Sequence, residues 1–328
     1  MEEVRESTRW AAERSEQVRI DQEALARFAK ELEAGGLQVP QWDYRYHFYD
    51  GGERTVAYLL VLDGLNFCFW APKGGKRWEI EYGGEVLSGY FALAAALKRA
   101  FIEGIPLDDA ESLSRLSPDG LREILDGRGR SRGELQLLHK RCAILNELGR
   151  VLLERYEGRR ASRPGRLVKA AGGSAVRLVR SLVRDFPSFC DEAEYKGRKV
   201  FFYKRAQIFA ADLWSTFGGQ DWGRFDDISE LTAFADYKLP QVLRQLGILW
   251  YSPELAAKVD RLEPLEAGSP EEVEIRANTI QAVELLREEL NYLGKDLTAV
   301  ELDRLLWEMG QRPEFKRKPH HRTVTIFY

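Results

Sequence analysis

The sequence predicts an α+β fold that is mainly helical, with a small antiparallel β-sheet near the N-terminus. Helix-forming residues dominate, and only 12 of the 328 residues are proline. Hydrophobic residues make up 44% of the chain, which is enough for a large core. Between residues 39 and 84, however, segments rich in Tyr, Phe, Trp and Val alternate with glycine pairs, a pattern typical of strands and turns.

Two basic loops help to divide the chain into three segments, which we expect to form one integrated globule. The loops lie at residues 127–133 and 157–166, where runs of Arg and Gly are typical of solvated connections. The predicted segments are 1–104, with a helix over 1–34 and an antiparallel meander over 39–84; 105–166, a helical insert; and 167–328, a helical core.

Several helix starts in the C-terminal segment are marked by capping residues. They are Ser252-Pro253, Ser269-Pro270, and the capping box of Thr298 and Glu301. Asp227 and Glu230 resemble another capping box, which predicts a short helix up to residue 236. The residues from 320 to 328 are predicted to form a strand or an extended segment docked by its aromatic side chains.

The stretch from residue 186 to 251 carries charges within an apolar pattern. Aromatic and aliphatic residues recur at helical spacing, yet four charged residues lie among them: Lys204, Arg205, Asp212 and Asp236. Such charges cost free energy unless they are paired or bind a ligand. The stretch is therefore either a core crossed by ion pairs or the wall of a polar ligand pocket.

Asp303 is a candidate for catalysis. Its helical neighbours three and four positions away are mainly apolar, and they include Ala299, Val300, Leu306 and Trp307. A carboxylate in apolar surroundings is desolvated, and desolvated carboxylates are frequent in functional sites. A surface aspartate beside an apolar stripe would show the same spacing. Arg304 and Glu308 lie four residues apart on this helix, and by default they form a surface salt bridge.

Three further residues are candidates for ligand binding. Phe225 precedes a predicted helix start, and Asp227 is its predicted N-cap. Together they also form an aromatic face beside a carboxylate, which suits a flat base that stacks and donates hydrogen bonds. His47 lies on a predicted strand among aromatic residues, where a packed structural role is the simpler interpretation.

Charge and cysteine content argue against several classes of protein. A net charge of −3 argues against a general nucleic-acid coat protein. The three cysteines form no CxxC pair, which indicates reduced thiols in a cytosolic protein and no zinc ribbon. No secretory signal or membrane-spanning run is evident. His320 and His321 lack spaced carboxylate or cysteine partners, so we expect neither a metal nor another cofactor.

Residues 239–259 predict two short helices joined by a turn that contains Gly247. This layout resembles the helix–hairpin–helix motif of DNA glycosylases, although any helical hairpin with a glycine cap shares it. Longer motifs carry a more specific resemblance. They are FPSFCDEAEYKGRKVFFYKRAQIFAADLW, FADYKLPQVLRQLGIL, EEVEIRA, DRLLW, HHRTVTIFY and, in the first half, WDYRYHFYD. Together these motifs resemble the queuosine-salvage protein family, the queuosine 5'-phosphate N-glycosylases, most densely over residues 180–328.

The resemblance implies a core related to helix–hairpin–helix DNA glycosylases. It also implies hydrolysis of the N-glycosidic bond of queuosine 5'-phosphate, which releases queuine for tRNA modification. The family's catalytic carboxylate falls on Asp303. The family's base-binding positions fall on His47, Phe225, Asp227, Arg304 and Glu308. Relatives can carry an aromatic residue at position 304 and Asp at position 308, so the chain departs from them there.

The chemistry of this reaction agrees with a carboxylate in the site. N-glycoside cleavage passes through an oxocarbenium-like state that a carboxylate stabilises or attacks. Queuine has a carbon where purine glycosylases often protonate a nitrogen, so stabilisation on the sugar side gains importance. The 5'-phosphate requires a cation, and the candidates are Lys204, Arg205, His321 and Arg322.

Two other functions share these features. A DNA or RNA base glycosylase would have a similar fold and chemistry, but it would need a basic face that the sequence does not show. A non-catalytic queuine-binding protein would need the aromatic and acidic residues but no carboxylate facing the sugar. We expect a small-molecule substrate, no stable nucleic-acid complex, no membrane association and a cytoplasmic location.

Overall fold

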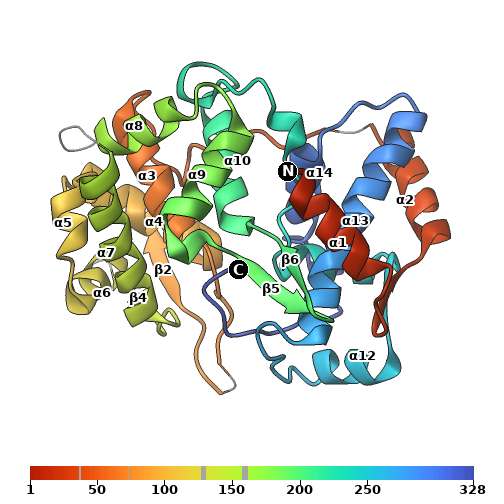
Figure 1. Cartoon of the computed structure of the whole chain (residues 1–328). Helices are drawn as coiled ribbons and strands as arrows, with labels where there is room; N and C mark the ends of the chain where they lie inside the picture. The colour runs from red at the N-terminus through yellow and green to blue at the C-terminus, as the bar shows by residue number, and fades with distance from the viewer. Residues whose placement is uncertain (37, 73, 127–130, 157–161) are drawn as a thin grey trace.

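The computed structural model describes residues 1–36, 38–72, 74–126, 131–156 and 162–328. Over these ranges the chain is mainly helical with small antiparallel sheets, as the sequence predicts (Figure 1). No helix within them combines the length and the apolar character needed to cross a membrane. The relation to helix–hairpin–helix glycosylases and the three-segment division stay predictions.

The elements follow one another in an irregular order of helices and short strands. The α-helices are α1 (Glu2–Ala12), α2 (Gln22–Ala34), α3 (Glu53–Gly64), α4 (Gly89–Ile102), α5 (Ala110–Ser114), α6 (Pro118–Asp126), α7 (Leu138–Arg155), α8 (Ser162–Ala170), α9 (Ala175–Asp185), α10 (Lys204–Thr216), α11 (Lys238–Gln245), α12 (Pro253–Asp260), α13 (Pro270–Tyr292) and α14 (Ala299–Met309). The strands are β1 (Val18–Ile20), β2 (Glu79–Tyr82), β3 (Glu85–Ser88), β4 (Ser131–Arg132), β5 (Glu192–Tyr195), β6 (Arg198–Phe201) and β7 (Leu249–Tyr251). Single 3-10 turns are η1 (Pro187–Phe189), η2 (Asp221–Gly223), η3 (Ile228–Glu230) and η4 (Pro313–Lys316).

The single helix predicted over residues 1–34 is wrong, because strand β1 interrupts it. β1 pairs antiparallel with β7, and Val18 lies opposite Tyr251. The buried carboxylate of Glu274 accepts hydrogen bonds from three successive backbone N–H groups that end at Val18. A new helix then begins at α2, where Asp21 accepts the N–H of Ala24 as an N-cap.

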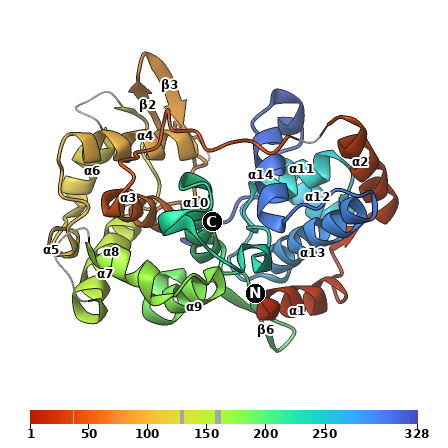
Figure 2. The same cartoon turned by 90° about the horizontal axis from the view of Figure 1, so that it is seen from above.

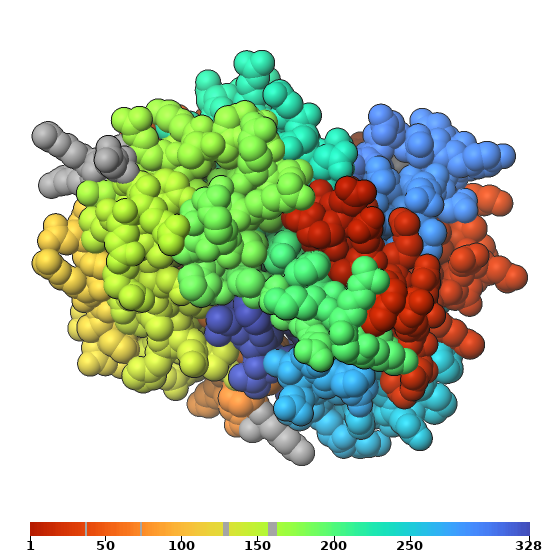
Figure 3. Space-filling view, viewed as in Figure 1, coloured from red at the N-terminus to blue at the C-terminus, as the bar shows by residue number. Residues whose placement is uncertain are grey.

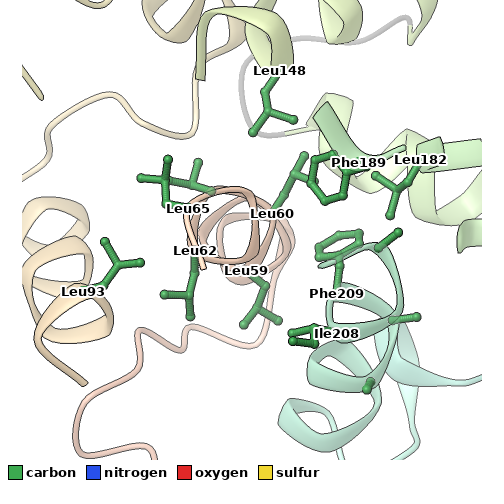
Figure 4. Close-up of a cluster of buried hydrophobic side chains, with 14 of the residues drawn as sticks. Leu59, Leu60, Leu62, Leu65, Leu93, Leu148, Leu182, Phe189, Ile208 and Phe209 are labelled. Atoms are coloured by element: carbon green, nitrogen blue, oxygen red, sulfur yellow. The ribbon is translucent and has the colours of Figure 1, made fainter. Parts of the chain in front are cut away.

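The antiparallel meander predicted over residues 39–84 is also wrong, except for the β2–β3 hairpin. Residues 53–64 form helix α3, which is buried on every side from Thr55 onward. Figure 4 shows the leucines of α3 and the following Leu65 pointing to different sides of the helix, among Leu93, Leu148 and the aromatic residues of neighbouring elements. A helix surrounded by core has no polar face, so its apolar run resembles that of a buried strand.

The helix predicted to run from residue 227 to 236 is reduced to the 3-10 turn η3, and the chain is then extended. The side chain of Asp227 does not cap this turn. It accepts hydrogen bonds from the Ala175 N–H at 2.6 Å and from the Ser174 hydroxyl at 2.5 Å, at the start of α9. The other predicted caps are confirmed, including the complete capping box of Thr298 and Glu301.

Two hydrophobic cores organise the fold. The larger core draws mainly on helices α3 to α10, and the smaller core on α2 and α11 to α14. Figure 2 shows these two groups on opposite sides, with α10 between them. It also shows the segment over residues 38–52 crossing from α2 to α3. The site described below lies where the two cores meet.

The N-terminal helix and the C-terminal residues both pack against the rest of the fold. Figure 3 shows helix α1, in red, against the green β5–β6 hairpin, with the dark blue C-terminal residues exposed in part beside it. The Tyr328 side chain is buried, and its backbone carbonyl accepts the Cys68 N–H at 2.9 Å. The prediction of an extended, aromatic-docked segment at residues 320–328 is confirmed. The predicted basic loops lie partly outside the described residues, at 127–130 and 157–161. The prediction of a loop is wrong for residues 162–166, which belong to helix α8, and residues 131 and 132 form strand β4.

Candidate active site

A cavity of about 490 Å³ opens between the two cores. Its walls come from residues 40–47, from α4 and α10, from residues 234–236 and from α14. The lining combines aromatic rings with acidic and basic side chains, among them Trp42, His47, Tyr90, Lys204, Asp212, Phe234, Asp236, Asp303, Arg304, Trp307 and Glu308. This mixture suits an aromatic ligand with polar edges.

Asp303 lines this cavity from helix α14 and is only 6% exposed. Its Oδ1 accepts the backbone N–H of Phe234 at 2.7 Å, which fixes the carboxyl group beside the Phe234 ring. Burial raises the pKa of Asp303 well above its usual range, and the nearby Asp236 and Asp212 add to the rise. The structure thus excludes the surface alternative for Asp303.

His47 lies in the same wall, on a turn and not on the predicted strand. Its Nδ1 lies 2.6 Å from the Asp43 carbonyl, and its Nε2 lies 2.9 Å from the Tyr90 hydroxyl. Burial lowers the pKa of His47 to about 4, so the ring is neutral at neutral pH. Because a carbonyl only accepts, Nδ1 carries the hydrogen, and Nε2 accepts the Tyr90 hydroxyl hydrogen.

Arg304 and Glu308 face the same cavity. The Arg304 guanidinium lies 5.6 Å from the centre of the Trp42 ring, a cation–π distance. Partial burial lowers the pKa of Arg304, while Asp212 opposes that change. Among the described ion pairs, none within 4.0 Å joins Arg304 to Glu308, so the expected surface salt bridge is absent.

The adjacent cations Lys204 and Arg205 point in different directions. Lys204 lines the cavity, and its ammonium donates to the Asn66 carbonyl at 2.9 Å. Burial lowers the pKa of Lys204 to about 8. The Arg205 guanidinium instead donates to the Gly64 and Ser188 carbonyls inside the core. Arg205 is therefore a structural residue and not a phosphate ligand.

A second cavity of about 360 Å³ adjoins the first and shares Lys204, Asp236 and other walls with it. Its lining is strongly basic, with Arg77, Lys204, Lys238, Lys316 and Arg322. The predicted candidate Arg322 belongs to it and lies 5.3 Å from the Trp70 ring centre. His321 does not line either cavity. It is buried with its Nε2 3.2 Å from the Tyr328 hydroxyl, and burial lowers the pKa of His321 to about 3.

Phe225 and Asp227 do not reach either cavity. Phe225 packs in the larger core, and Asp227 accepts a backbone hydrogen bond at the start of α9. Phe234 and Asp236 line the cavity instead, with the same Phe-X-Asp spacing. The sequence contains the Phe-X-Asp spacing twice, and only the fold shows that the second copy faces the cavity. The extended chain after η3 brings it to Asp303.

Comparison with known proteins tests the family resemblance directly. The family model described as "Queuosine salvage protein" matches residues 46–328. The chain belongs to the queuosine salvage protein family. A relative from Sphaerobacter thermophilus, named queuosine 5'-phosphate N-glycosylase/hydrolase, is 49% identical over 98% of this chain and 96% of its own length. Relatives with the same name from Mus musculus and Dictyostelium discoideum are 39% and 37% identical, over 99% of this chain and 98% of their own lengths.

In this member of the queuosine salvage protein family, acidic, basic and aromatic side chains line the cavity. Within the described ranges, no three His, Cys, Asp or Glu side chains cluster as a metal site. The carboxyl groups of Asp303, Asp212 and Asp236 line one cavity with Lys204 and Arg304. Such an arrangement can bind a polar aromatic base, stabilise a cation and transfer protons.

Proposed function

We propose that this chain hydrolyses the N-glycosidic bond of queuosine 5'-phosphate and releases queuine. The observation that carries the proposal is a buried carboxyl group, Asp303, hydrogen-bonded to the backbone of an aromatic residue in a cavity large enough for a nucleoside. The names of the full-length relatives supply the substrate. We propose a free nucleotide as the substrate and no nucleic-acid complex. Free thiols at all three cysteines agree with a reducing, cytoplasmic location.

In this mechanism, Asp303 acts on the sugar. As the bond between the ribose and the base breaks, positive charge develops on the ribose. The ionised Asp303 carboxylate stabilises that charge in a site with little water, where the interaction is strong. The Phe234 N–H holds the carboxylate in place, so little reorganisation is needed during the reaction.

The base binds among the aromatic and acidic residues of the larger cavity. Phe234 stacks on the base, and Asp236 accepts its ring N–H and amino donors. The Oδ1 of Asp236 is already held by the backbone N–H groups of Lys238 at 2.7 Å and Leu239 at 2.9 Å, which orient the group. His47, Arg304 and Glu308 complete the base and side-chain contacts. Phe234 and Asp236 thus replace Phe225 and Asp227 in the binding role.

The adjoining basic cavity receives the 5'-phosphate. Lys204 lies on the shared wall, where it can contact both the sugar region and the phosphate. Arg322 offers a planar guanidinium that matches phosphate geometry. The remaining cations of this cavity, Arg77, Lys238 and Lys316, raise the local positive potential.

The purified protein should release queuine from queuosine 5'-phosphate faster than from queuosine, without added metal. Chromatography of the products measures both rates. Arg322→Gln should raise KM for the nucleotide about 10–100-fold, since a charge-assisted contact contributes roughly 1.5–3 kcal/mol. The same change should leave the rate with queuosine nearly constant. An equal loss with both substrates would contradict the phosphate role, and no release from either would refute the proposed function.

Phe234→Ala should weaken queuine binding, because stacking on an aromatic ring contributes about 1–3 kcal/mol per base. Binding of free queuine by calorimetry measures this loss as roughly a 10–100-fold rise in Kd. Phe225→Ala is the matched control, since Phe225 is equally buried in the same core but does not line the cavity. The control should lower the free energy of unfolding by about 3–5 kcal/mol and leave the Kd of the folded protein unchanged. The opposite pattern would restore Phe225 as the stacking residue.

A further inference from the structure

Two carboxyl groups meet at the wall of the larger cavity. Asp212 of α10 lines the cavity, and Asp63 of α3 lies behind it with 0% exposure. Their side chains are in hydrogen-bonding contact with each other. Neither forms an ion pair within 4.0 Å among the described residues. Both oxygens of Asp63 are buried, and no donor group of the described residues reaches them.

This contact requires a proton. Two ionised carboxylates have only acceptor oxygens, so they repel each other and cannot form a hydrogen bond. A protonated carboxyl group donates to its neighbour and removes the repulsion. Burial raises the pKa of Asp63 and that of Asp212, which favours the same state. The pair therefore holds at least one proton at neutral pH and titrates as a unit.

Asp212 is the member of the pair that can reach a ligand. It lines the larger cavity, whereas Asp63 lines neither cavity. Tyr90, whose hydroxyl lies 2.9 Å from Nε2 of His47, lines the same cavity. A proton held by the pair can therefore pass to a bound ligand only through Asp212.

Several charged and titratable groups surround the pair from four helices. They are Tyr58 on α3, Tyr90 on α4, Lys204 and Arg205 on α10, and Asp303 and Arg304 on α14. The cations favour an ionised carboxylate, so they make it easier for Asp212 to give up its proton. The anionic form left behind is stabilised by Arg304 and Lys204.

We propose that Asp212 is the general acid that protonates the departing base and that Asp63 is its positioning residue. The inference rests on the proposed function. The electron pair of the carbon–nitrogen bond moves to the base, and the Asp212 hydroxyl proton neutralises it. Water forms the new bond to the ribose carbon and loses one proton, which restores the pair. The products are queuine and ribose 5-phosphate, and atoms and charge balance. Asp303 thus stabilises the charge on the sugar, and Asp212 protonates the leaving group.

Asp63→Asn tests the pair without removing its hydrogen bond. The asparagine amide donates to Asp212 permanently but adds no negative charge, so the pKa of Asp212 falls. A general acid must be protonated, and the basic limb of the kcat/KM profile should therefore move about one pH unit or more to lower pH. Asp212→Asn should lower kcat about 10²–10⁴-fold, the usual contribution of a positioned acid. Both variants change the volume of the side chain very little.

Asp185→Asn is the matched control. Asp185 is a buried aspartate that accepts a tyrosine hydroxyl, from Tyr156 at 2.6 Å, and it lies in neither cavity. The Asp185→Asn variant should leave the pH profile of kcat/KM unchanged. Infrared difference spectra of the folded proteins supply a readout without turnover. The protonated-carboxyl C=O band of the wild type should weaken in Asp63→Asn and persist in Asp185→Asn.

The two readouts separate the possible failures. If the wild type releases no queuine, the proposed function fails, while the infrared band still tests for the shared proton. If the wild type is active and Asp63→Asn keeps its pH profile and its band, the acid pair is refuted. If Asp63→Asn does not fold, full activity in Asp212→Asn would overturn the inference by itself.

Discussion

Asp303→Asn should lower the rate of queuine release by about 10²–10³-fold, the size of effect expected when a preorganised electrostatic partner of the transition state is lost. Asparagine keeps an oxygen that can accept the Phe234 N–H, so the geometry of the site is retained. It removes only the negative charge that stabilises the developing cation. The measurement is single-turnover release of queuine, together with the Kd for queuine. Release should collapse while the Kd changes little.

The pH profile gives an independent check on Asp303. Its pKa is raised by burial, and the reaction needs the ionised form. Activity should therefore rise with pH through this raised pKa, and the acid limb should lie above the pH range of an ordinary aspartate, near 4. In Asp303→Asn this limb should disappear from the residual activity. Full activity in the variant, or an unchanged acid limb, would remove Asp303 from the mechanism.

Asp191→Ala should lower the free energy of unfolding by about 3–5 kcal/mol, because it leaves a buried guanidinium without its main partner. Asp191 holds Arg276 of α13 through two hydrogen bonds, at 2.9 and 2.6 Å, and both side chains are at most 3% exposed. The guanidinium also lies between the Phe202 and Tyr328 rings, at 3.9 and 4.4 Å from their centres. Urea denaturation followed by circular dichroism measures the loss.

Asp260→Ala is the control for this prediction. Asp260 also accepts two hydrogen bonds from an arginine, Arg244, but its side chain is 51% exposed. Solvent screens this pair, and its loss should cost at most about 1 kcal/mol. Equal losses for the two variants would show that burial does not govern the strength of these pairs. Arg276 also donates to the Ala235 carbonyl at 3.0 Å, so the Asp191 variant should displace the Phe234–Asp236 wall as well.

The parts of the fold that the sequence predicted well are those governed by local chemistry. The start of α14 follows from the capping box of Thr298 and Glu301, and its length follows from its apolar spacing. The same spacing left the burial of Asp303 open, and the fold decides it. Helix α3 was missed because its environment, not its own residues, decides between a buried helix and a buried strand.

The site depends still more on contacts between distant segments. Lys204 and Arg205 are adjacent and both cationic, yet only Lys204 reaches the cavity, because the Arg205 guanidinium is bound by core carbonyls. Phe225 and Phe234 likewise have the same spacing to an aspartate. Their different places depend on how the chain folds back over the 69 positions that separate Phe234 from Asp303. No local pattern contains that information.

The position of the cavity between two cores has a consequence for the abundance of the protein in a cell. Residues 40–47 and helices α4 and α10 form one side, and α14 forms the other, so a bound nucleotide adds contacts to both cores. Ligand present at about 100 times its Kd stabilises a folded chain by roughly 2.7 kcal/mol. Unfolded chains are the ones that proteases remove. A chain without the proposed nucleotide lacks this stabilisation, so it should unfold more often and be more exposed to proteases.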